Sequence, residues 1–179
     1  ISAGDLLLIF HATDTNAISR TWSGSFIELH DAVASAGMGI AYKIAGGGDS
    51  CTVTKGEAEK FSAIALRITG AHATQAPELG TVATGTSTGP DAGSVTASWG
   101  VEDNLFITWH SHVTAGSNTT ITTWPASYTD NQLEGTWFTT SGEPNLATQN
   151  LAGATDDAGA WLISASLGWR AGTLVVRPA

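Results

Sequence analysis

The chain has 179 residues, of which 42% are hydrophobic and 13% are charged, and its formal net charge is −9. A hydrophobic fraction of this size supplies a full core and excludes a disordered chain. Only seven lysine and arginine residues are present, and they are scattered. Nucleic acids and anionic membrane surfaces are bound by clustered positive charge on a protein, so the sequence disfavours both as partners.

Cys51 is the only cysteine, which excludes an intrachain disulfide and a thiolate metal cluster. A single cysteine in a β-rich chain is most often a small buried hydrophobic side chain. No apolar stretch has the length of a transmembrane helix, so we expect no membrane insertion. We also expect no cofactor.

Strand signals dominate the first part of the chain. Leu6, Leu8 and Phe10 alternate with other apolar residues, which predicts a central strand that is covered on both faces. Further strands are predicted at 26–30, 39–45 and 62–68. Amphipathic helical periodicity is missing, and the abundant Gly, Ser and Thr residues are typical of β proteins with many turns.

Residues 71–93 contain closely spaced glycines and prolines, which predict an irregular surface connection with room for one short edge strand. The chain then resumes strand patterning at 94–100, at 102–110 and, near its end, at 173–177. Strands at spacings of about ten residues are typical of sandwiches and barrels. We therefore expect an all-β fold, a jelly-roll-like β-sandwich of about eight strands in a single domain over residues 1–179.

The same β-rich unit occurs twice in the sequence. The segment 4–11 is echoed by 102–110 at an offset of 99, with Leu6 aligned to Leu105. The turn 22–26 is echoed by 124–128 at an offset of 102, and 61–66 by 169–174 at an offset of 108. The offsets rise in chain order, as loop insertions in a duplicated unit require. This pattern predicts two similar halves, residues 1–70 and 94–179, joined by the connection 71–93.

With these motifs in view, the chain resembles a family of duplicated β-sandwich proteins encoded by tailed bacteriophages. The resemblance rests on the Gly-Asp-Leu-Leu-Leu start at Gly4, the aromatic residue after the Ser-Gly-Ser or Pro-Ala-Ser turn, the stretch 41–45 and the ending 169–179. It covers nearly the whole chain, and its motifs mark strands and turns. It implies a virion component of the capsid decoration, tail or fibre-associated type. It also implies an additional strand before Gly4, and it carries no catalytic residues.

His110-Ser111-His112 is the best candidate for chemistry in this sequence. On a strand, residues i and i+2 project from one face, so two imidazoles could share a metal ion. A third ligand would be needed, and the repeat places His11 at the position equivalent to His110. The alternative is that all three histidines are polar residues on the less buried face of paired strands. No acidic motif lies nearby, so this alternative is favoured.

Seven tryptophans are unusual for this length, and two interpretations compete. Trp22, Trp109 and Trp169 each align with an aromatic residue in the other half, which favours packing. Trp99, Trp137 and Trp161 have no such partner, and they are the candidates for a platform on which a sugar ring stacks.

Our leading functional hypothesis is a non-enzymatic structural protein of the virion, an extracellular particle assembled from proteins made in the host cytoplasm. It would cement capsid subunits or form part of a tail by docking on other virion proteins, and it could also self-associate. The alternative is a carbohydrate-binding or receptor-binding module that recognises a host surface glycan.

Overall fold

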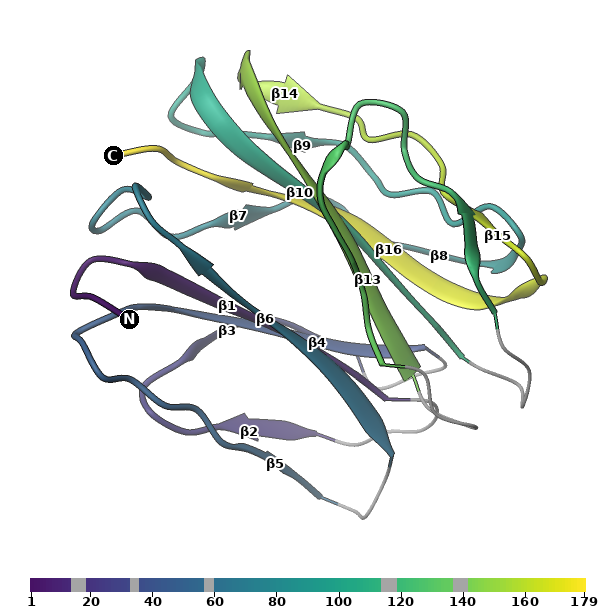
Figure 1. Ribbon diagram of the computed structural model, residues 1–179, viewed down its shortest axis with the longest axis horizontal. Helices are drawn as coiled ribbons and strands as arrows, with labels where there is room; N and C mark the ends of the chain where they lie inside the picture. Colours follow the sequence, from purple (N-terminus) through teal and green to yellow (C-terminus); the bar gives the residue numbers. More distant parts are fainter. Residues whose placement is uncertain (14–18, 33–35, 57–59, 114–118, 137–141) are drawn as a thin grey trace.

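The computed structural model describes residues 1–13, 19–32, 36–56, 60–113, 119–136 and 142–179. Across these residues the chain contains strands and no helix, and two antiparallel sheets pack face to face (Figure 1). The predicted all-β sandwich is therefore confirmed. Within the same residues, no helix is long and apolar enough to cross a membrane.

The first sheet has four strands from the first part of the chain. The central strand β1 (Leu6–Thr13) pairs with β4 (Gly37–Ile44) on one side and with β6 (Phe61–Ile68) on the other. The strand β3 (Ile27–Ala32) pairs with β4, so the order is β3-β4-β1-β6. Because β1 lies in the middle, both of its faces are largely covered, as its apolar sequence predicts.

The second sheet has six strands. Its central strand is β10 (Glu102–Val113), and the order is β12-β13-β10-β16-β7, with β8 also paired to β16. The other strands are β7 (Glu78–Leu79), β8 (Ala83–Ser87), β12 (Asp130–Glu134), β13 (Gly142–Gly153) and β16 (Leu167–Val176). The connection 71–93 thus supplies two strands to this sheet, where the sequence predicted room for one.

Three short strand pairs lie outside the two sheets. They are β2 (Arg20–Trp22) with β5 (Val53–Lys55), β9 (Val95–Thr96) with β14 (Thr155–Asp156), and β11 (Ile121–Thr123) with β15 (Leu162–Ile163). Figure 1 shows β2 and β5 below the first sheet. With the ten strands of the two sheets, these pairs give sixteen strands in the described part of the chain, where about eight were expected.

The two sheets have the same strand order around their central strands. In the first sheet Leu6 pairs with Ile68, and in the second Leu105 pairs with Val176. These pairs are related by the offsets of 99 and 108 that the sequence repeat gives independently. Each position of the first sheet therefore has a topological equivalent in the second. A duplicated origin of the two halves stays a prediction.

The main core lies between the sheets. Leu6, Leu8 and Phe10 point inward from β1, and Ile107 and Trp109 point inward from β10. A second apolar cluster covers the outer face of the second sheet, and it includes Phe106, Tyr128, Trp161 and Val175. Burial of large aromatic and aliphatic side chains in both places is the main source of stability.

Gly172 provides a test of how tightly the inner core is packed. It lies opposite Trp109 in the second sheet, and a Cβ at this position would lie 2.8 Å from the indole ring. Because Trp109 is fully buried, the ring has little room to move. We expect Gly172→Ala to lower the free energy of unfolding by about 1–2 kcal/mol in denaturant titrations. Gly46→Ala is the control, since open space surrounds Gly46, and a change below about 0.5 kcal/mol is expected. Equal effects of the two substitutions would contradict tight packing at Trp109.

Candidate functional site

His110 and His112 lie side by side on the outer face of β10. The His112 Nδ1 and His110 Nε2 atoms are 3.3 Å apart, and the rings stack with centroids 5.4 Å apart. Both side chains are buried. The prediction that these two residues share one face is therefore confirmed.

His11 does not join them. It lies on β1 in the first sheet, where its Nδ1 accepts a hydrogen bond from Arg20 Nε at 3.0 Å and its ring stacks on Phe61. The sheets pack through their inner faces, so the outer faces that carry His11 and His110 point away from each other. Among the described residues, no three His, Cys, Asp or Glu side chains are grouped to hold a metal ion. The predicted metal site of His11, His110 and His112 is therefore not formed.

The histidine pair has two polar neighbours on β13 that the sequence did not reveal. Glu143 lies opposite His112 with Oε2 3.8 Å from Nε2, and Asn145 lies opposite His110 with Nδ2 3.4 Å from Nε2. All four side chains are buried. A single sequence could not indicate these contacts, because they depend on the register between strands more than thirty residues apart.

Burial keeps the two histidines of this histidine–glutamate cluster (His110, His112, Glu143 and Asn145) uncharged near neutral pH. It lowers the pKa of His112 to about 4, and burial and His112 together hold the pKa of His110 well below its ordinary value. Burial, and secondarily the charge of Glu134, raises the pKa of Glu143 to about 7. Glu143 is thus the member of the cluster that changes charge near physiological pH.

The equivalent place in the first sheet is filled by a buried arginine. Arg20 forms an ion pair with Asp31, and its NH2 group donates a hydrogen bond to Thr13 Oγ1 at 2.9 Å. Its side chain crosses Gly39, the equivalent of Asn145, where a Cβ would lie 2.9 Å from Arg20 Nε. Burial, and secondarily the positive charge of Arg20, lowers the pKa of His11 to about 4. These contacts identify a structural network.

The tryptophans proposed for sugar stacking have different surroundings. Trp161 is fully buried and packs against Trp124 and His110, at ring centroid distances of 4.9 and 4.5 Å. It offers no face to a sugar, so its proposed stacking role is corrected. Trp99 is half-buried, and its indole N–H donates a hydrogen bond to Asn104 Oδ1 at 2.7 Å. Trp137 lies outside the described residues.

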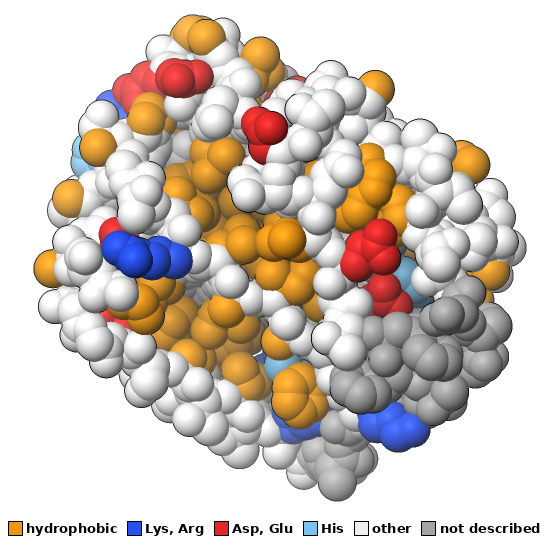
Figure 2. Space-filling model, in the orientation of Figure 1, with side chains coloured by type: hydrophobic (Ala, Val, Ile, Leu, Met, Phe, Trp, Pro, Cys, Tyr) orange, Lys and Arg blue, Asp and Glu red, His pale blue; other side chains and the backbone are white. Residues whose placement is uncertain are grey.

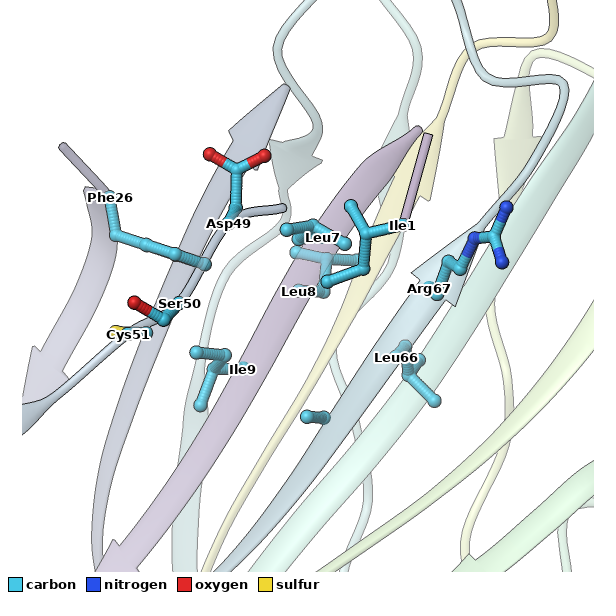
Figure 3. A pocket seen from close by; sticks show the side chains of 11 residues that line it. Ile1, Leu7, Leu8, Ile9, Phe26, Asp49, Ser50, Cys51, Leu66 and Arg67 are labelled. Carbon is cyan, nitrogen blue, oxygen red and sulfur yellow. The ribbon is translucent and has the colours of Figure 1, made fainter. Parts of the chain in front are cut away.

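An apolar groove opens on the outer face of the first sheet. Figure 3 shows Phe26 and Cys51 on one side of it and Arg67 on the other, with Leu7 and Ile9 of β1 between them. Its volume is about 290 Å³, and its lining is Ile1, Leu7, Leu8, Ile9, Phe26, Asp49, Ser50, Cys51, Ala65, Leu66 and Arg67. Figure 2 shows hydrophobic side chains gathered in hollows on the face where β6 lies in front.

Two ion pairs border this groove. Arg67 Nε lies 2.7 Å from Asp5 Oδ2, and Lys43 pairs with Asp49. Burial raises the pKa of the Cys51 thiol, which is free and half-buried. The sequence did not predict the groove, because five separate segments line it and each of them is ordinary strand or turn sequence.

No family model matches the sequence, and no curated protein and no solved structure shows significant similarity to it.

Proposed function

We propose that this chain is a non-enzymatic structural component of a tailed bacteriophage particle, of the capsid decoration, cement or tail-associated type. It acts by docking on other virion proteins. The observation that carries the proposal is the apolar groove beside the edge strand β6. The sequence resemblance to phage β-sandwich proteins supplies the virion setting.

Two properties of this surface support docking. Among the described strands, β6 pairs with β1 alone, so its outer edge carries backbone groups that can pair with another chain. The groove next to that edge is lined mostly by aliphatic and aromatic side chains. An unpaired edge with an adjoining apolar hollow is suited to recognition of an extended segment.

The carbohydrate-binding alternative has less support. It relied on Trp99, Trp137 and Trp161, of which Trp161 is buried and Trp99 is held by Asn104. We therefore carry forward the docking role.

The proposed function predicts that the chain remains on the particle through purification. Virions of the phage that encodes it would be banded on a density gradient, and the chain would be quantified by mass spectrometry against the major capsid protein. We expect a fixed ratio to the capsid protein across the band, because virion sites are multiplied by symmetry. A chain found only in the soluble lysate, and encoded outside the virion genes, would overturn the proposal.

A further inference from the structure

The two sheets have equivalent strands, but only the second has a closed outer face. Phe106 and Val175 in the second sheet are both 0% exposed. Their equivalents by register are Leu7, which is 7% exposed, and Arg67, whose side chain is 47% exposed. Ala65 is exposed as well, whereas its equivalent Thr173 is completely buried. The groove lies where the first sheet lacks the cover that the second sheet has.

Residues 78–98 supply part of the cover of the second sheet, beside Tyr128 and Trp161. Within this segment, β7 and β8 pair with the edge of β16, which is the equivalent of β6. Val95 and Ala97 then pack on the outer-face cluster that contains Phe106 and Val175. One extended segment of the chain thus extends the sheet and also helps to close its outer face.

Backbone hydrogen bonds also hold the part of that segment that packs on the outer face. The strand β9 pairs with β14, and the Ala97 N–H donates to the Ala154 carbonyl at 2.7 Å. Ile40 and Leu146 lie opposite the equivalent residues Phe10 and Trp109. Counted along the chain from Ile40 and Leu146, β14 corresponds to residues 49–50, which follow the last residue of β4. Residues 49–51 form a wall of the groove and belong to no strand. The first sheet therefore presents both surfaces that the covering segment contacts in the second.

Charge indicates one feature of the occupant. Glu78 lies opposite Val175 in the second sheet, and Arg67 is the equivalent of Val175. An occupant that runs along β6 as β7 runs along β16 would place the side chain at the position of Glu78 opposite Arg67, where a carboxylate would complement the guanidinium. Arg67 uses its Nε to bind Asp5, and a guanidinium has five N–H donors, so it can bind a second carboxylate.

We propose that the groove and the free edge of β6 bind an extended segment of a partner protein. This segment runs antiparallel to β6, carries a carboxylate opposite Arg67 and inserts small or β-branched apolar side chains between Phe26 and Leu7. The proposal rests on the proposed docking function and adds the surface and the partner chemistry. The mode is β-augmentation, in which the backbone gives affinity and the alternate side chains give specificity.

Cys51 makes the proposal directly testable, because the only cysteine of the chain lines the groove. The probe is a synthetic peptide with the sequence of residues 76–99, which holds the covering segment of the second half. The full chain would be titrated with this peptide while the reaction of Cys51 with a disulfide reagent is followed. We expect at least a tenfold fall in the reaction rate at saturating peptide. Exchange of the peptide with the native segment of the second sheet would leave Cys51 exposed to the reagent.

Matched controls separate groove binding from nonspecific adhesion. A peptide carrying Val95→Asp and Ala97→Asp should give no protection. In the protein, Ala65→Asp places a charge on the exposed outer face of β6 and should abolish protection by the unmodified peptide. Val101→Asp changes an exposed residue outside the groove lining and should retain it.

Three results would overturn the proposal. The first is an unprotected Cys51 even when residues 76–99 are fused ahead of Ile1 through a Gly/Ser linker. The second is equal protection by the Asp-substituted peptide. The third is protection that rises with protein concentration alone, together with a dimer in analytical ultracentrifugation, which would assign the groove to a second copy. Virion association is measured separately. If the chain is bound to particles but the peptide does not protect Cys51, the groove proposal alone is overturned. If the peptide protects Cys51 but the chain is not bound to particles, the virion role alone is overturned.

Discussion

Replacement of Arg20 by methionine is expected to lower the free energy of unfolding by about 3–5 kcal/mol, since it breaks a buried ion pair from one side. The side chain of Arg20 is 1% exposed and pairs with Asp31. It also donates to His11 Nδ1 and to Thr13 Oγ1. Arg20→Met removes the guanidinium from all three acceptors and leaves Asp31 with the backbone N–H of residue 20, and each unpaired buried group costs free energy. Guanidinium chloride titrations followed by tryptophan fluorescence would measure the loss.

Arg177→Met is the matched control for this prediction. Arg177 binds Glu102 through Nε and NH2, the latter at 2.7 Å, but the side chains of the pair are 29% and 30% exposed. Exposed pairs of this kind contribute about 0–1 kcal/mol. The double variant Arg20→Met/Asp31→Asn should recover part of the loss, because it removes the unpaired carboxylate. A loss at Arg20 no larger than that at Arg177 would show that the Arg20 network is not a main support of the first sheet.

The sequence predicted the elements whose signal is local. Leu6, Leu8 and Phe10 share a face because strand side chains alternate, and the same alternation correctly placed His110 beside His112. The strand expected at 94–100 is limited to Val95–Thr96, because this segment crosses the outer face of the second sheet and pairs with only two residues of β14. For the connection 71–93 the sequence left room for one short edge strand but did not locate β7 and β8, since two to five residues among glycines carry little periodicity.

The features that the sequence could not predict depend on which strands become neighbours. Glu143 reaches His112 only through the register of β13 on β10. Trp161 becomes a core residue because β15 brings its neighbours against β11, over the outer face of the second sheet. The groove exists because the outer face of the second sheet is covered and the equivalent face of the first sheet is not. No property of Leu7 or Ile9 alone distinguishes these two cases.

Glu143→Gln is expected to stabilise the protein at pH 8 by on the order of 3 kcal/mol relative to its effect at pH 4.5. The pKa of Glu143 is raised from 4.5 to about 7 in the folded state. Between these values the unfolded chain releases the proton while the folded chain keeps it. The carboxyl group therefore costs stability progressively as the pH rises from 4.5 to 7, and the cost is constant above that range. Glutamine does not titrate, so the difference between the variant and the parent chain isolates this cost.

Histidine titration also changes the free energy of unfolding with pH, but in the opposite direction, so that stability rises with pH. Because the parent chain and the variant carry the same histidines, this change largely cancels in the difference between them. The pKa values of His11 and His112 are lowered to about 4, so the stability that these neutral imidazoles provide is present above pH 6.5 and is lost as the pH falls toward 4. Glu28→Gln is the control, since Glu28 is exposed on β3 of the other sheet and is not among the groups that shift the pKa of Glu143, and its effect should stay within about 0.5 kcal/mol at every pH. Urea titrations at intervals between pH 4.5 and 8 would give the three curves. A Glu143→Gln difference that does not change with pH would mean that Glu143 ionises normally in the folded chain, and that water reaches the histidine–glutamate cluster.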